Sequence, residues 1–354
     1  MTNADINEDF LNDFDYIEKN NYYWDISICH SDGKTRNIFY GKNKKNNNDD
    51  IFVKQTIISP LTYNTILREI YFLLFIKNKE YFADLYDMRI NKDKQKIFLL
   101  FKGNNVDLFT FINSKTYYLS NKELIKWIIY QITFGLYFLH SNKIIHNNLN
   151  PSSILINEEG GAFIWDLGSA TYQEETSYDF SLPYSAPEFL NGNPISNEKL
   201  DMWGLGIIML ELFLKKNKIL KVESQDNNNR VQLKFILSKF GINQNNEEID
   251  ELIKDEKNPT EIILDNNQIE NIGDPNAIDL IKHLLTLNPK KRYTVEQVLK
   301  SKYLEEYLNL DTFNLPKMEN PINYKKLSDD MNIDLFLKIY DTLYSTLKNL
   351  NKTK

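Results

Sequence analysis

The residues best suited to chemistry lie in one short polar stretch and at a few charged positions around it. Residues 144–156 read IIHNNLNPSSILI, so the stretch carries amides and hydroxyls in place of carboxylates. An amide such as that of Asn148 can orient a neighbouring group, but it is not basic and does not take up a proton. Asp166 lies 18 residues beyond Asn148.

This stretch resembles the catalytic loop of the eukaryotic protein kinases, H-R-D-L-K-P-x-N-x-L-I. The positions that carry the chemistry differ from the family. Asn148 stands where the family has its base Asp, Asn150 where it has Lys, and Ser153 where it has the metal-binding Asn. Asn147 replaces the Arg. The positions that match are His146, Leu149, Pro151, Leu155 and Ile156.

The resemblance continues through the nucleotide site, over about residues 24–304. Lys54 aligns with the Lys of V-A-I-K, which implies an ion pair with Glu69 that either contacts phosphates or only ties a helix to a sheet. Asp166 aligns with the Asp of D-F-G, which implies a Mg²⁺ ligand if a nucleotide binds. Of the glycine-rich loop, only Gly33 is kept.

Phe52 replaces a small Ala that lies against adenine in the family. Residues two apart on a strand face the same side, so Phe52 is expected to share the nucleotide side with Lys54. We therefore expect its ring to occupy the space of the base, packed on Ile38 and Leu155.

Other matched positions have structural roles in the family. The resemblance implies a buried ion pair between Glu188 and Arg292, and a role for Asp201 in holding the backbone of the catalytic loop. The Asp107-Leu108 pair and residues 231–241 resemble the CMGC branch, which contains the cyclin-dependent and MAP kinases.

The secondary structure predicted to position these residues changes along the chain, from mainly strands at first to mainly helices later. Short segments rich in β-branched and aromatic residues predict strands, and apolar residues at helical spacing predict helices. The resemblance and this order predict an α+β, bilobal protein kinase-like fold with a small β-rich N-lobe and a large helical C-lobe. The strands are expected over residues 25–28, 37–40, 51–56 and 97–101, and the helices over 65–77, 122–140, 201–214, 276–287 and 295–299.

The predicted boundaries divide the chain into three parts. Residues 1–21 form an acidic N-terminal extension, and residues 22–304 form the kinase-like domain, with an N-lobe of about 22–102 and a C-lobe of about 103–304. Residues 305–354 form a C-terminal extension with an amphipathic helix. The apolar residues of both extensions follow a helical period. Each extension either docks on the domain or presents a surface to a partner.

Composition limits the remaining functions. A net charge of -7 argues against a nucleic-acid-binding protein, which needs a dense positive surface. The longest apolar runs are too short to insert into a membrane. The single cysteine, Cys29, forms no internal disulfide, which favours a reducing compartment, and we expect a cytoplasmic location.

The altered catalytic loop leads to the expectation of a pseudokinase, which is a catalytically inactive scaffold or allosteric protein-binding module rather than an enzyme. We expect one or more protein partners and no cofactor, with ATP and Mg²⁺ bound at most at low affinity. Two alternatives stay open: a weak or atypical Ser/Thr protein kinase that transfers phosphate from ATP, and a nucleotide-binding switch.

Overall fold

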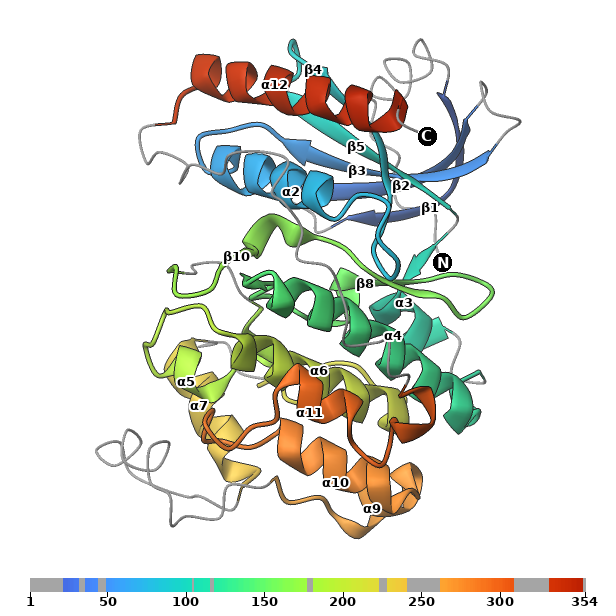
Figure 1. Ribbon diagram of the computed structural model, residues 1–354, viewed down its shortest axis with the longest axis vertical. Helices are drawn as coiled ribbons and strands as arrows, with labels where there is room; N and C mark the ends of the chain where they lie inside the picture. The colour runs from blue at the N-terminus through green and yellow to red at the C-terminus, as the bar shows by residue number, and fades with distance from the viewer. Residues whose placement is uncertain are drawn as a thin grey trace. The chain divides into compact units, whose positions relative to one another are not determined.

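The fold consists of two compact units, which we describe separately (Figure 1). The first contains Met1–Asn105 and Asn320–Lys354, and the second contains Val106–Glu319. The predicted α+β fold with a β-rich and a helical part is confirmed, whereas the predicted domain boundaries stay predictions. The computed structural model describes residues 22–31, 36–43, 49–103, 105–114, 118–176, 181–222, 228–240, 262–308 and 331–352.

The first unit is built on one five-stranded antiparallel sheet. Its strand order is β1-β2-β3-β5-β4, so neighbouring strands in the sheet are mostly neighbours in the chain. The strands are rich in aromatic and β-branched residues, which pack well on a pleated surface. Their bounds are Tyr22–Ser31 for β1, Arg36–Asn43 for β2, Asp49–Ile57 for β3, Leu85–Asn91 for β4 and Lys96–Lys102 for β5.

The two faces of this sheet bury different side chains. Successive residues of a strand point to opposite faces, so Val53 and Phe52 of β3 lie on opposite sides. Val53 belongs to an apolar cluster that also contains Phe39, Ile51, Phe98 and Leu100. Phe52 and Lys54 share the other face, and both are buried.

Two helices complete the first unit. Helix α2, Tyr63–Phe75, is buried along most of its length, and α12, Ile333–Lys352, packs against α2 and β4. Figure 1 shows α12 running beside α2. Phe336 of α12 is fully buried, with its ring 5.1 Å from that of Tyr63. The C-terminal amphipathic helix therefore docks on the β-rich unit.

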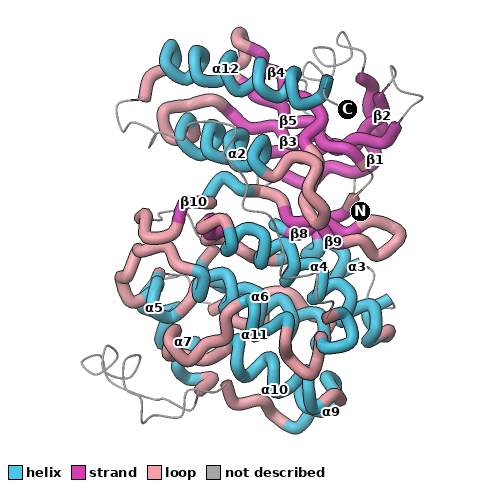
Figure 2. Tube along the Cα trace, in the orientation of Figure 1, coloured by secondary structure: helices cyan, strands magenta, loops and turns pink. Residues whose placement is uncertain are grey.

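The second unit is mainly helical (Figure 2). Its central helix, α6, is buried on almost all sides, as the continuous apolar run predicts. The helices are α3 Leu108–Ser114, α4 Lys122–Ser141, α5 Pro187–Leu190, α6 Glu198–Leu214, α7 Asn229–Ser238, α9 Asn266–Ile272, α10 Pro275–Leu284 and α11 Val295–Leu299.

Short strands and single 3₁₀ turns join these helices and carry the polar stretch 144–156. Strands β6, β8 and β9 form one small sheet, and β7 pairs with β10. The strands are β6 Val106–Asp107, β7 Ile144–Ile145, β8 Ile154–Ile156, β9 Ala162–Ile164 and β10 Thr171–Tyr172. The 3₁₀ turns are η1 Tyr118–Ser120, η2 Pro151–Ser153, η3 Leu167–Ser169, η4 Leu182–Tyr184 and η5 Glu305–Tyr307.

Two glycines let α6 approach its neighbours. A Cβ at Gly204 would lie 2.6 Å from the carbonyl oxygen of Leu149, and one at Gly206 would lie 2.8 Å from Leu285. Heavy atoms do not approach this closely, so only glycine fits here. Gly204 thus lets the helix pack directly on the polar stretch. Within the described part of the chain, none of the helices has both the length and the apolar character that a membrane span needs.

Candidate active site

A carboxylate on α6 fixes the backbone of the polar loop. The fully buried Asp201 accepts hydrogen bonds from the backbone N–H groups of His146 and Asn147, each at 2.9 Å. Its Oδ2 also lies 2.8 Å from Nε2 of His140. A buried carboxylate is stable only when it is paired in this way. Asp201 therefore holds the loop in one conformation, as the resemblance implied.

His146 connects the loop to the segment that follows β9. Its Nε2 lies 3.1 Å from the carbonyl oxygen of Trp165, which accepts a hydrogen bond from the protonated nitrogen. Its Nδ1 accepts from the backbone N–H of Asn148 at 3.4 Å. The imidazole is fully buried. It acts as a structural connection between Asn148 and the residue preceding Asp166.

The amides of Asn148 and Asn150 are bonded to their surroundings. Asn148 Oδ1 accepts a hydrogen bond from the backbone N–H of Ser181 at 2.9 Å. Asn150 Nδ2 donates to the carbonyl of Asn148 at 2.7 Å, and its Oδ1 accepts from the backbone N–H of Ser152 at 2.9 Å. The two amides stabilise the loop and the start of the segment that follows residue 180.

The Ser153 hydroxyl both donates and accepts a hydrogen bond within the loop. It donates to the carbonyl of Asn150 at 2.8 Å and accepts from the N–H of the same residue at 3.0 Å. Together with the Asn150 side chain, it forms a capping box at the start of η2. The side chain is 1% exposed. The buried, neutral hydroxyl is a poor ligand for Mg²⁺, which favours carboxylates, so Ser153 does not fit the role of a metal ligand.

Asp166 has a strained backbone. Its φ of 58° and ψ of 54° lie in the left-handed region, which residues other than glycine rarely adopt. Strain of this kind concentrates at functional sites. The side chain is half-buried and lies between β9 and η3.

A magnesium ion fits at Asp166 only when a ligand completes its coordination. Among the described residues, no group of three or more His, Cys, Asp or Glu side chains could hold a metal ion. Mg²⁺ commonly binds through one or two carboxylates together with substrate phosphates. Asp166 would therefore hold one Mg²⁺ jointly with a nucleotide.

In the first unit, Lys54 and Glu69 form a buried ion pair. Lys54 Nζ of β3 donates to Glu69 Oε1 of α2 at 2.6 Å, and both residues are at most 3% exposed. Burial of an unpaired charge would cost several kcal/mol, so each side chain depends on the other. This pair, expected from the resemblance, is present and fixes α2 to the sheet.

Phe52 packs against a neighbour that sequence reasoning did not name for it. Its ring stacks on that of Phe101 of β5, with centroids 4.8 Å apart and an interplanar angle of 9°. Antiparallel register places these two residues directly opposite each other. Both rings are essentially unexposed, whereas Ile38 lies opposite Lys54 in the register.

Asn147 contributes contacts that sequence reasoning missed. Its Nδ2 donates to the carbonyl of Ser169 and to Oγ1 of Thr171, each at 2.9 Å. Thr171 in turn donates to Ser196 at 2.8 Å and is 2% exposed. These neutral bonds hold β10 close to the loop. They depend on the folded backbone, so no pattern in the sequence could have revealed them.

Glu188 and Arg292 form the buried ion pair that the resemblance implied. The guanidinium donates two hydrogen bonds to the carboxylate, at 2.7 and 2.9 Å. Two other predicted features, Gly33 and the helical pattern within residues 1–21, lie outside the described residues.

Comparison with known proteins decides the family. The model of the protein kinase domain matches residues 43–304, which is most of the chain. This chain belongs to the protein kinase family. The family transfers phosphate from ATP with the help of Mg²⁺.

The curated relatives of this kinase-family chain are themselves named as kinases. It is 33% identical to a probable CTD kinase subunit alpha homolog of Encephalitozoon cuniculi, over 61% of this chain and 65% of the relative. It is 29% identical to the mitogen-activated protein kinase mpk-1 of Caenorhabditis elegans, over 61% and 50%. It is 30% identical to the mitogen-activated protein kinase HOG1 of Colletotrichum orbiculare, over 60% and 60%. The chain thus spans less than two thirds of the length of each of these relatives.

These relatives correct two predictions. The expected inactive pseudokinase and the expectation that the chain is not an enzyme are wrong, because the matched proteins are kinases. The physical reason is that the loss of a base does not by itself exclude phosphoryl transfer. Phosphoryl transfer passes through a loose transition state, so positioning and charge stabilisation supply most of the catalysis. The alternative of a weak or atypical kinase agrees better with the comparisons.

Proposed function

We propose that this chain is a Ser/Thr protein kinase that transfers phosphate from ATP slowly. The buried pair of Lys54 and Glu69 is the observation that carries the proposal. In active kinases a pair of this kind binds the α- and β-phosphates and must be in place for transfer. The names of the relatives, a CTD kinase and two mitogen-activated protein kinases, support the same activity.

Each side chain has a defined part in this proposal. Lys54 binds the nucleotide phosphates, and Glu69 keeps its ammonium in position. Asp166 holds Mg²⁺, which neutralises charge on the phosphates when bound. Asn148 Oδ1 already accepts from the N–H of Ser181 and from Nδ2 of Asn150, so Asn148 orients the substrate hydroxyl by donating a hydrogen bond from its own Nδ2. It takes up no proton, so the hydroxyl proton leaves to the transferred phosphoryl group.

The neutral side chains make the transfer slow. A positioned base is worth about 10²–10⁴-fold in rate, and Asn148 supplies none. A charged stabiliser of the transition state is worth roughly 10²–10³-fold, and Asn150 is uncharged. The residue effects need not multiply, because groups that act together are not additive.

Phe52 lowers the affinity for ATP in this proposal. Its ring takes the place of a small side chain next to the base, and its stacking on Phe101 holds it there. Replacement by alanine is expected to strengthen ATP binding. Because loss of a buried phenyl ring also destabilises the fold, by about 3–5 kcal/mol, binding is measured by calorimetry below the unfolding range.

A partner protein and a cytoplasmic location complete the proposal. The relative from Encephalitozoon cuniculi is named as a subunit, which supports a protein partner for this chain. Use of ATP and the single cysteine fit the cytoplasm. Co-purification of the native protein, followed by identification of what comes with it, tests the partner.

Transfer is tested with γ-labelled ATP, Mg²⁺ and a library of Ser- and Thr-containing peptides. The variants are Lys54→Ala and Asp166→Asn, and the control is Lys92→Ala, which changes an exposed lysine of the same unit. Wild type and control should transfer label at the same slow rate, and both site variants should lose it. Label transfer that is equal in all four proteins would come from a contaminant and would contradict the proposal.

A nucleotide-binding switch is the second candidate. It is favoured by the two hydrogen bonds that Asn148 Oδ1 accepts, from the N–H of Ser181 and from Nδ2 of Asn150, which leave this oxygen unable to accept from a substrate hydroxyl. A switch would show a Mg²⁺-dependent rise in melting temperature with ATP and no label transfer. No such rise at millimolar ATP would remove both candidates.

A further inference from the structure

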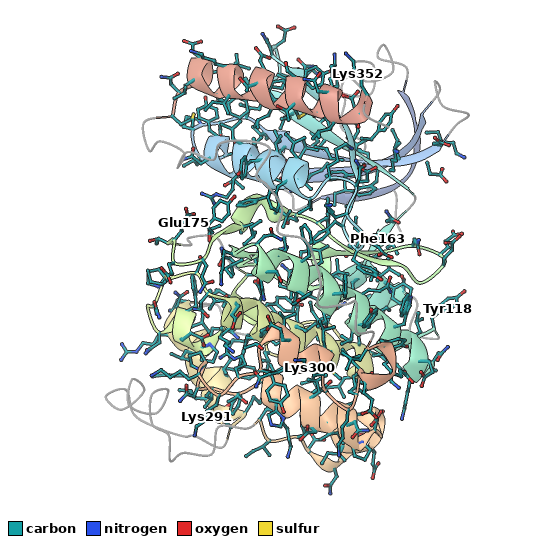
Figure 3. All side chains as sticks on the ribbon, in the orientation of Figure 1. Tyr118, Phe163, Glu175, Lys291, Lys300 and Lys352 are labelled. Carbon is teal, nitrogen blue, oxygen red and sulfur yellow. The ribbon has the colours of Figure 1, made fainter. Side chains whose placement is uncertain are left out.

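A pocket in the first unit lies between the edge strand β4, the end of β5 and the C-terminal part of α12. Its volume is about 410 Å³, and residues of β4, β5 and α12 line it. Small-molecule sites commonly have volumes of 300–1,000 Å³, so the space is large enough for a compact ligand. Lys352, labelled in Figure 3 at the end of α12, belongs to its lining.

Positive charges outnumber negative ones in this pocket. The lining contains Arg89 and Lys102 from the strands and Lys348 and Lys352 from α12. Asp87 is the one carboxylate among the described lining residues. Arg89 pairs with it, at 2.7 Å between Nη2 and Oδ2 and 3.0 Å between Nη1 and Oδ1. Lys102 also forms an ion pair with Asp84 outside the lining, at 3.6 Å between Nζ and Oδ2, so Lys348 and Lys352 supply most of the excess positive charge.

Two tyrosine rings hold cations at the wall of the pocket. Lys348 Nζ lies 4.4 Å from the ring centre of Tyr344, and Lys102 Nζ lies 5.6 Å from that of Tyr86. Arg89 also contacts Tyr344: its Cζ lies 5.6 Å from the centre of the ring, and its Nη1 donates a hydrogen bond to the hydroxyl. Cation–π contacts restrict the lysine side chains, which lowers the entropy that a ligand must remove.

The two walls of the pocket are fixed to each other. Asn351 Nδ2 donates to the carbonyl of Tyr86 at 3.0 Å, and the Tyr340 hydroxyl donates to the carbonyl of Met88 at 3.3 Å. These bonds join α12 to β4 before and after Lys348. The site is thus formed before any ligand arrives.

We propose that this pocket binds a phosphate group. A lysine ammonium is a compact point charge that suits phosphate, and several of them can share its two negative charges. Lysines in the last turns of a helix also compensate the helix dipole, which would account for Lys348 and Lys352. That explanation does not cover Arg89 and Lys102, which come from two strands and line the same space, each of them paired with a carboxylate, Asp87 or Asp84.

The test is isothermal titration of the full chain with inorganic phosphate at fixed ionic strength, with chloride as the reference anion. The Lys348→Ala/Lys352→Ala double variant removes two exposed lysines of the pocket. The matched control is Lys338→Ala, an exposed lysine of the same helix outside the lining.

We expect the double variant to bind phosphate at least about tenfold more weakly, because two near charges are lost. Lys338→Ala should bind it as the wild type does. Equal binding by the double variant, equal loss in Lys338→Ala, or no binding below about 10 mM would each overturn the proposal.

The origin of the phosphate is resolved by two further probes. A phosphothreonine peptide and its unphosphorylated form are titrated against the same proteins. Tighter binding of the phosphopeptide than of inorganic phosphate, lost in the double variant, assigns the site to a phosphorylated side chain. Equal or weaker binding, also lost in the double variant, assigns it to a free phosphate ester. Equal binding of both peptides overturns the proposal.

Discussion

In the loop of residues 146–153, amide side chains form hydrogen bonds at positions where the family has charged side chains. Asn148 and Asn150 bond to each other and to backbone N–H groups, and Asn147 holds β10. Asp in place of Asn148 would keep the acceptor oxygen that the N–H of Ser181 needs. The loop is therefore shaped so that a carboxylate could be restored without rearrangement.

The first prediction concerns this substitution. Asn148→Asp should raise the rate of phosphate transfer by about 10²–10⁴-fold, because a positioned base is regained. The measurement is single-turnover transfer from γ-labelled ATP to the preferred peptide. Asn142→Asp, which adds the same charge at the end of α4, should leave the rate unchanged. An unchanged rate in Asn148→Asp would show that proton removal is not what limits transfer.

A second prediction concerns Glu211 of α6. Burial raises its pKa from 4.5 to about 8, although its Oε1 accepts from the N–H of Ile219 and its Oε2 from Tyr184. Between these two pH values the folded chain keeps a proton that the unfolded chain releases. The free energy of unfolding therefore falls as the pH rises from about 4.5 to about 8.

Glu211→Gln should flatten this dependence, because its amide is neutral at every pH and keeps the oxygen acceptor. The melting temperature, measured from about pH 5 to about pH 8.5, should fall less in the variant than in the wild type. Glu198→Gln removes a less buried carboxylate of the same helix and serves as the control. If the melting temperatures of both variants fall with pH as steeply as that of the wild type, Glu211 is not the cause of the pH dependence.

Sequence patterns predicted part of this site and missed another part. Lys54 with Glu69 and Glu188 with Arg292 could be paired from a family resemblance, because each residue occupies a fixed motif position. The capping by Ser153 and the bonds of Asn147 could not, because they arise from the backbone path of the loop. The stacking of Phe52 on Phe101 depends on strand register, which a single sequence does not specify.

At the scale of elements, α12 takes part in the core of the first unit. Its apolar face follows the helical period that the sequence showed, and Phe336, Leu343 and Leu347 are all buried. The helix rests on α2, which carries Glu69. Strand β4 and helices α7 and α9 were not predicted, since their apolar patterns are short or interrupted by polar residues.

A third prediction tests the docking of α12. Phe336→Ala should destabilise the first unit by about 3–5 kcal/mol, because it removes a fully buried ring that packs on Tyr63. Urea unfolding, followed by circular dichroism, measures the change. Leu335→Ala alters the adjacent, 36% exposed side chain and should cost much less. An equal loss of unfolding free energy in the two variants would mean that the contact between Phe336 and Tyr63 contributes little to stability.

At the scale of the whole molecule, the first unit is made from two separate parts of the chain. Residues 106–319 lie between these parts and form the second unit. Each unit has its own buried residues, so a change in one need not unfold the other, and a single unfolding transition is not assured.

A fourth prediction follows from this arrangement. A chain truncated after Glu319 should exchange amide hydrogens faster in α2 and β4, since α12 no longer covers them. Protection in α4 and α6 of the second unit should stay as in the full chain. Hydrogen exchange with peptide-level mass spectrometry makes the comparison. Uniformly faster exchange would indicate that the two units unfold together.

The return of the chain to the first unit also sets an order during synthesis. A ribosome makes the five strands of the sheet first, then all of residues 106–319, and only afterwards α12. The surface of α2 around Tyr63 therefore stays uncovered while more than two hundred residues are added. The helical unit can complete its fold in this interval, whereas the β-rich unit cannot complete its core until α12 has been made. Nascent chains halted before Phe336 are the species in which chaperones would meet this exposed apolar face.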